Sequence, residues 1–281
     1  MFNFFKKKNK NIDKTDSQFQ AKESIDEKTQ LIQRWDAFLA KIEERFHTST
    51  DQAKEALLEQ LVENDYDYNA TLRAWKSMRS KILKITDQIK LTWDTKVGPK
   101  MEPLGDFHYD EENKGDILSD KLYDHMAIHA INIEGAIAQA FYEHAIKTIE
   151  KDFLCTQCHS PLQIDKEVFR SHYVDCQYCN TTNTYQPNVK YNQIGWFAID
   201  ALVEMKCLEE FKALQAAETK INDIRPPVSN EVIKEHQEAY WIYHNKILDT
   251  KETYKSDEVE RRDIYMNQLE VNRLDYIKRH T

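Results

Sequence analysis

Four of the five cysteines lie in one short segment, as two pairs with the same internal spacing. Cys155 and Cys158 form the first pair, and Cys176 and Cys179 form the second, after seventeen intervening residues. Two cysteines separated by two residues can direct both sulfurs from one tight turn towards a common centre. Two such turns supply four thiolates, the tetrahedral ligand shell of a structural zinc ion. The sequence therefore predicts one zinc ion held by these four side chains.

The residues around the two pairs are consistent with tight turns joined by short strands. A turn of this type often needs a left-handed backbone after the second cysteine, and His159 and Asn180 occupy those positions. Histidine and asparagine adopt positive φ more readily than most residues. Short runs rich in β-branched and aromatic residues follow, at 162–164, 168–174 and 181–185. They predict a small sheet around the metal.

This segment resembles the four-cysteine zinc ribbon, in which two knuckles are joined by a small antiparallel sheet. The resemblance covers about residues 153–187 and is carried by Cys155, Cys158, Cys176 and Cys179. It implies that the zinc ion is structural and holds together a segment too small to build a core alone. The commonest knuckle pattern has a glycine after each pair, and this chain lacks it.

Other uses of the cysteines are open at this stage. A disulfide or a redox pair would suit a secreted protein or a βαβ context, and we expect neither here. His159 or His172 could replace one cysteine as a ligand. A catalytic zinc would need an open coordination position, which a shell of four cysteines does not offer.

The composition predicts a mostly helical protein. The chain has 281 residues, of which 41 % are hydrophobic and 31 % charged, with only five glycines and six prolines to interrupt helices. The net charge of −9 disfavours general nucleic-acid binding, which needs a basic surface. We expect no transmembrane helix and no secretory signal, and the cysteine pattern then favours a reducing, cytoplasmic setting.

Hydrophobic periodicity predicts where the helices lie. We expect helices over about 26–47, 69–95, 119–153, 191–222 and 229–275, the last of which could be broken near Ser256 and Asp257. A further helix is expected to start at a capping box at 49–52. In these helices Trp35 and Trp75 are predicted core anchors, Cys207 a buried thiol, and Phe197, Ile264 and Leu274 part of the buried faces. The fold class is mostly α, with long antiparallel helices as a bundle or hairpin and the zinc ribbon inserted at the hairpin tip.

The same pattern predicts four regions along the chain. Residues 1–24 form a disordered basic and aromatic tail, and 25–97 an N-terminal helical region. Residues 98–117, which hold two prolines and two glycines within eight positions at their start, form a linker. Residues 118–281 contain the helical hairpin, the ribbon insert at 153–187 and the C-terminal helix.

Two further features could bind a ligand. His125 and His129 are four residues apart on a predicted helix, so both side chains face one way and could hold a second metal. A carboxylate could come from Asp200 or Glu204, although histidines packed within the core explain the pair more simply. Residues 1–10 combine three phenylalanines with lysines and could touch an anionic membrane. A solvated tail is the simpler interpretation.

The function that follows is a non-enzymatic one. We expect a zinc-binding helical protein that acts as an interaction or scaffold module for another protein. One alternative is a nucleic-acid-associated zinc-ribbon protein. The other is a metal-dependent enzyme with a second site at His125 and His129.

Overall fold

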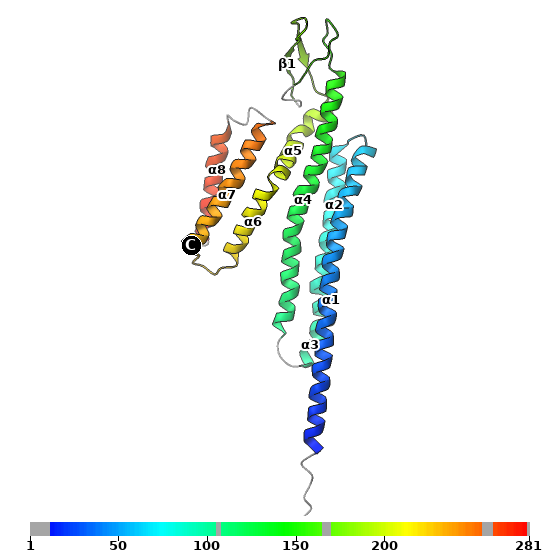
Figure 1. Cartoon of the computed structure of the whole chain (residues 1–281), viewed down its shortest axis with the longest axis vertical. Coiled ribbons are helices and arrows are strands. Elements are labelled where there is room, and N and C mark those ends of the chain that lie inside the picture. The colour runs from blue at the N-terminus through cyan, green and yellow to red at the C-terminus, as the bar shows by residue number, and fades with distance from the viewer. Residues whose placement is uncertain (1–11, 105–107, 165–169, 255–260, 280–281) are drawn as a thin grey trace, which may run out of the picture. The chain divides into compact units, whose positions relative to one another are not determined.

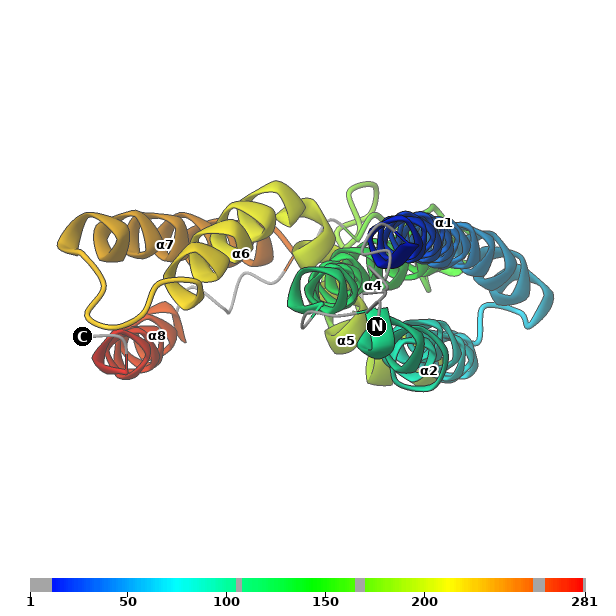
Figure 2. The ribbon, with the colours of Figure 1, turned by 90° about the horizontal axis from the view of Figure 1, so that it is seen from below.

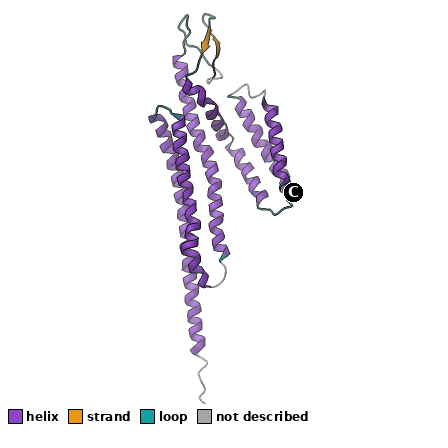
Figure 3. Cartoon of the chain, turned by 180° about the vertical axis from the view of Figure 1, so that it is seen from behind, coloured by secondary structure: helices purple, strands orange, loops and turns teal. Residues whose placement is uncertain are grey.

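The computed structural model describes residues 12–104, 108–164, 170–254 and 261–279, and within them the protein is mostly helical with one small antiparallel sheet (Figures 1 and 3). The helical segments, in order, are α1 (Ile12–Glu63), α2 (Tyr68–Thr92), α3 (Gly98–Met101), α4 (Tyr109–Asp152), α5 (Val189–Lys206), α6 (Leu208–Asn222), α7 (Asn230–Glu252) and α8 (Arg262–Lys278). The two strands are β1 (His172–Asp175) and β2 (Thr182–Tyr185). The chain packs as two units, which are described separately. The first combines residues up to Gln52 with Met78–Met126, and the second combines Ala53–Ser77 with Ala127–Thr281.

Helix α1 is longer and more continuous than its sequence predicts. It runs unbroken through residues 49–52, so the predicted capping box does not open a new helix. Thr50 is buried, and its hydroxyl donates a hydrogen bond of 2.7 Å to the carbonyl oxygen of His47 within the helix. This back-bonding satisfies the side chain without a helix end. Residues 12–24 also belong to α1, which corrects the predicted disorder there, while residues 1–11 lie outside the described residues.

Trp35 anchors the core of the first unit, as predicted. Its side chain is 1 % exposed, and its indole N–H donates a hydrogen bond of 2.9 Å to the carbonyl oxygen of Glu111 in α4. Its ring lies 5.4 Å from that of Trp93, centroid to centroid. A buried indole needs a partner for its N–H, and α4 supplies it.

Ion pairs show that α1 and α4 run parallel in the first unit. Lys114 contacts Asp36 at 3.0 Å, and Lys121 contacts Glu43 at 2.7 Å, each pair 78 residues apart. The two pairs are seven residues apart on both helices, so the same faces meet after two turns. Because these pairs are exposed, each contributes at most about 1 kcal/mol and mainly sets the register.

The predicted linker at 98–117 is largely helical. A π-helical turn at Trp93–Val97 follows α2, and α3 and a 3-10 turn at Glu102–Leu104 come next. Pro99 lies in the first turn of α3, where its missing N–H is not needed. Helix α4 already begins at Tyr109, ten residues before the start predicted at 119.

The second unit contains a row of buried aromatic rings. The chain turns after α1, with Asp65 and Tyr66 at φ of 50° and 55°. From there the ring of Tyr68 lies 5.3 Å from that of Phe141 in α4, which lies 5.7 Å from that of Tyr191 in α5. Trp75, the second predicted anchor, is 0 % exposed. These rings join the start of α2 to α4 and α5.

Helices α4 and α5 pack against each other in antiparallel directions. Gly135 of α4 lies against Met205 near the end of α5, while Phe141 of α4 contacts Tyr191 near its start. The cysteine segment and its sheet connect the end of α4 to the start of α5 (Figures 1 and 3). The second unit therefore contains a helical hairpin of α4 and α5 with a small insert at its tip.

The helix predicted over 191–222 is divided at Cys207. This residue has φ −105° and ψ 22°, so α5 ends before it and α6 starts after it. Its thiol is 0 % exposed and lies 3.6 Å from the hydroxyl of Thr250, which confirms the predicted buried cysteine. Burial raises the pKa of this thiol.

The segment 229–275, for which the sequence allows a break near Ser256 and Asp257, forms two helices, α7 and α8, on either side of that position, and both lie beside α6 in Figure 2. Ser229 is the N-cap of α7 and accepts a hydrogen bond from the N–H of Val232 at 3.4 Å. Tyr276 of α8 stacks on His236 of α7, with ring centroids 4.7 Å apart. None of the described helices combines the length and the apolarity needed to cross a membrane.

Three side chains that the sequence assigns to buried faces are exposed. They are Phe197 at 69 %, Ile264 at 70 % and Leu274 at 52 %. In α8, Tyr276 and its neighbour Ile277 pack towards α7, so the face of the helix that carries Ile264 and Leu274 is exposed to solvent. A helix with apolar residues on two sides does not reveal from its sequence which side will be covered.

Candidate metal centre

The first cysteine pair lies in a tight turn that follows α4. The N–H of His159 donates to the carbonyl oxygen of Cys155 at 3.0 Å, and the N–H of Cys155 donates to the carbonyl oxygen of Ser160 at 2.8 Å. His159 has φ of 59°, as the sequence predicts for this position. A left-handed residue is needed because the chain reverses within one turn.

The second pair repeats the same turn. The N–H of Asn180 donates to the carbonyl oxygen of Cys176 at 2.8 Å, and the N–H of Cys176 donates to that of Thr181 at 2.9 Å. Asn180 has φ of 57°. Each turn therefore positions its two sulfurs by the same backbone bonds, and the two turns are equivalent.

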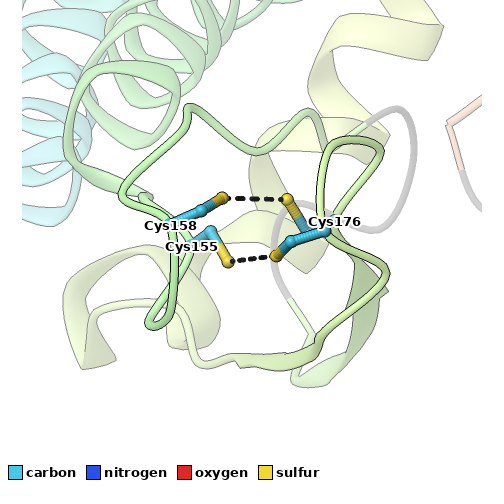
Figure 4. A group of neighbouring side chains, drawn as sticks. Cys155, Cys158 and Cys176 are labelled. Carbon is cyan, nitrogen blue, oxygen red and sulfur yellow. Dashed lines mark hydrogen bonds between the residues drawn. The ribbon is translucent and has the colours of Figure 1, made fainter.

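The turns place all four sulfurs around one point. Figure 4 labels three of these cysteines, Cys155, Cys158 and Cys176. The four Sγ atoms lie within 4.8 Å of one another. Cys158 Sγ is 3.5 Å from Cys176 Sγ, and Cys155 Sγ is 3.6 Å from Cys179 Sγ. Both distances exceed the ~2.05 Å of a disulfide bond, and all four cysteines are free. The arrangement can hold one metal ion.

The two strands connect the second turn to the rest of the segment. Strands β1 and β2 are antiparallel, with His172 opposite Tyr185 and Asp175 opposite Thr182. The run predicted at 162–164 contributes no strand, although Pro161 forms an isolated bridge with Leu154. Residues 165–169 lie outside the described residues.

Asn183 of β2 links the two turns, and sequence reasoning did not single it out. Its side chain is 2 % exposed, and its Oδ1 accepts hydrogen bonds of 2.9 Å from both the N–H and the hydroxyl of Thr156. Its Nδ2 donates to the carbonyl oxygen of Thr181 at 2.8 Å and lies 3.7 Å from Cys155 Sγ. Groups behind the ligands commonly fix ligand orientation in this way.

A hydroxyl lies beside the second sulfur of each turn. Ser160 Oγ is 3.3 Å from Cys158 Sγ, and Thr181 Oγ1 is 3.4 Å from Cys179 Sγ. In both contacts the thiol donates to the hydroxyl oxygen, and the hydroxyl of Thr181 in turn donates to Gln157 Oε1. The shared spacing C-x-x-C-x-Ser/Thr is the signal from which these two residues could have been found in the sequence.

The pKa values of the thiols are shifted in opposite directions. The backbone N–H groups of Cys158 and Gln157 lower the pKa of Cys155 to about 6. Cys176 also receives backbone hydrogen bonds that lower its pKa, but burial and the neighbouring thiols outweigh them and raise it to about 11. Four adjacent thiolates repel one another, so a bound cation is what would allow all four to ionise together.

No family model matches this chain, and no match is found among curated proteins or solved structures. The fold and the site therefore define a mostly helical protein with four clustered cysteines that can hold a metal ion.

The histidine pair predicted as a second metal site lies in a different setting. The ring of His125 is 5.2 Å from that of His47, centroid to centroid, and its buried Nδ1 has no hydrogen-bond partner. Among the residues whose side chains are described, neither His125 nor His129 belongs to a group of three or more potential metal ligands. Desolvation, with the charges of His47 and Lys121, lowers the pKa of His125.

Replacing Asn183 with alanine should weaken metal binding about 10- to 100-fold, the usual effect of removing a group that orients a ligand. The substitution removes the link between the turns and leaves the N–H of Thr156 without its partner. Competition with a chromophoric chelator measures the affinity. The matched control is Thr184→Ala, an exposed residue of the same strand, which should leave the affinity unchanged. Equal affinities for the Asn183 variant and the parent chain would remove Asn183 from this role.

Proposed function

We propose that this chain is a non-enzymatic helical protein that holds one structural zinc ion and binds another protein. The observation that carries the zinc assignment is the spacing of the sulfurs. Four sulfurs about 2.3 Å from a tetrahedral zinc ion lie about 3.8 Å from one another. The two sulfur pairs at 3.5 and 3.6 Å are close to this value. Paired turns with a small antiparallel sheet are also the architecture of a zinc ribbon.

The zinc ion has a structural role in this proposal. Among the described residues of the segment, the buried cluster consists of Cys155, Cys176 and Leu162, with Phe153 and Val174 packed against it, and the buried ring of Tyr185 lies against Phe153. So small a core does not offset the entropy of ordering the segment, whereas zinc binding to such modules is worth about 10–16 kcal/mol. Four thiolates also fill the coordination shell, so neither water nor substrate can bind the metal.

The same segment exposes aromatic side chains that suit a protein partner. Tyr173 and Tyr178 are each 77 % exposed, and Leu154 is 45 % exposed. Tyrosine is enriched at protein interfaces because it combines a large apolar ring with a hydroxyl that can stay hydrated. We therefore assign partner binding to the exposed side chains of Tyr173 and Tyr178.

Two measurements test the proposal. Elemental analysis of the full chain should find one zinc ion per molecule, and a second equivalent of metal would favour the enzyme alternative at His125 and His129.

A cross-linked pull-down should recover a partner that is lost with the double variant Tyr173→Ser/Tyr178→Ser. The partner should be kept with Tyr123→Ser, which changes a 48 % exposed tyrosine in the first unit. Partner recovery that is equal for all three chains would contradict the assigned surface.

Nucleic-acid association is a second candidate because exposed tyrosines can also stack on bases. The charge opposes it: Asp165, Lys166, Glu167, Arg170 and Asp175 sum to −1 across 153–187. Titration with labelled RNA and DNA at several salt concentrations separates the candidates, since phosphate contacts weaken steeply with salt. Salt-sensitive binding that is lost with the tyrosine double variant would favour nucleic acid over a protein partner.

A further inference from the structure

The two turns expose their sulfurs unequally. The first cysteine of each turn is buried, with Cys155 at 0 % and Cys176 at 1 % exposure. The second cysteine is more accessible, since Cys158 is exposed and Cys179 is partly buried. Cys158 is therefore the most exposed of the four cysteines. A small oxidant arriving from solution reaches Cys158 first.

A sulfur of the other turn lies close to that of Cys158. Cys158 Sγ and Cys176 Sγ are 3.5 Å apart, and a dashed line joins them in Figure 4. A disulfide bond of ~2.05 Å requires them to approach by about 1.5 Å. Two sulfurs held at this distance by rigid turns are positioned for exchange, provided that one of them is first oxidised.

We propose that Cys158 is an oxidation site for hydroperoxides and that its oxidation closes a Cys158–Cys176 disulfide and releases the zinc ion. This inference rests on the zinc site proposed above. Oxidation removes two of the four thiolates, which leaves Cys155 and Cys179 as the remaining ligands. A two-thiolate site has lost the closed shell that holds the metal.

The chemistry takes two steps with hydrogen peroxide as the oxidant. The Cys158 thiolate attacks one peroxide oxygen, the O–O bond breaks, and hydroxide leaves and takes a proton, so the sulfur becomes a sulfenic acid. The Cys176 thiolate then attacks that sulfur, the S–S bond forms, the S–O bond breaks, and a second hydroxide takes a proton. In total, two thiolates, one hydrogen peroxide and two protons give one disulfide and two waters.

The sequence allows the disulfide to be located directly. Lys166 and Arg170 lie between the two turns, so trypsin separates Cys155 and Cys158 from Cys176 and Cys179. A Cys158–Cys176 disulfide joins two tryptic peptides, whereas a Cys155–Cys158 disulfide stays within one. Mass spectrometry without reduction tells these products apart, and fragmentation of the joined peptides distinguishes a Cys158–Cys176 disulfide from a Cys155–Cys179 disulfide, which would overturn the proposal.

The experiment treats the full zinc-loaded chain with hydrogen peroxide and follows zinc release with a chromophoric chelator. We expect one molar equivalent of peroxide to release the one bound ion and to join the two peptides through Cys158 and Cys176. Dimedone present during the reaction should label Cys158 first. The Cys207→Ser variant should behave identically, because that thiol is buried outside the site.

The outcomes separate this inference from the proposed function. A chain that contains no zinc before treatment overturns the zinc site itself. Zinc that is present but retained in a tenfold excess of peroxide overturns only the oxidation site. A Cys155–Cys158 disulfide, or first labelling at another cysteine, equally overturns it.

Discussion

The Cys155→Ser variant should lose its zinc ion completely and leave the segment 153–187 unfolded, while the long helices persist. Cys155 is fully buried and contributes one of four sulfurs, and a serine hydroxyl does not ionise to replace it. Because zinc binding to such a module is worth about 10–16 kcal/mol, losing a ligand removes more free energy than the segment's small core supplies. Elemental analysis, with far-UV circular dichroism and the rate of trypsin cleavage after Arg170, measures these effects.

The fifth cysteine provides the control. Cys207→Ser makes the same chemical change at a position that is also 0 % exposed, beside the hydroxyl of Thr250. This variant should keep one zinc ion per chain and the slow cleavage of the parent. Removing the metal from the parent chain with a chelator should reproduce the Cys155 variant. Zinc retained after Cys155→Ser would mean that the ion is held elsewhere.

The Gly135→Ala variant should be less stable than the parent by about 2 kcal/mol or more, although alanine is the better helix former. A Cβ added at Gly135 would lie 2.2 Å from the Cβ of Met205, and 2.8 Å from its Cγ and Sδ. The long side chain of methionine can rotate away, but its Cβ is fixed to the backbone, so α4 and α5 must separate. Overpacking costs about 1–3 kcal/mol or occasionally more, and the helix propensity of alanine returns only about 1 kcal/mol.

A double-mutant cycle identifies the contact. Combining Gly135→Ala with Met205→Gly removes the Cβ clash, so the two changes should show a favourable coupling of about 2 kcal/mol. Combining it with Met205→Ala keeps the Cβ atom and should give a smaller coupling. Urea denaturation measures each free energy of unfolding. A Gly135→Ala chain at least as stable as the parent would contradict the close approach of the two helices.

The sequence alone determined the cysteine geometry to a large extent. The repeated spacing of Cys155–Cys158 and Cys176–Cys179, and the left-handed backbone at His159 and Asn180, follow from local turn chemistry within a few residues. The amphipathic periodicity likewise identified the long helices and their tryptophan anchors, because one covered face leaves a clear 3.6-residue pattern. Both signals are short-range, and for that reason they can be read from the chain.

The tertiary structure decided the rest, because those features depend on residues far apart in the chain. Helix α1 passes through residues 49–52 since its buried face continues there, and packing overrides a weak local capping signal. Which face of α8 is covered depends on Tyr276 meeting His236 from another helix. Asn183 gains its role because folding brings Thr156 and Thr181 to its two ends. An asparagine in a polar strand has no local signal that distinguishes this buried link from an exposed surface position.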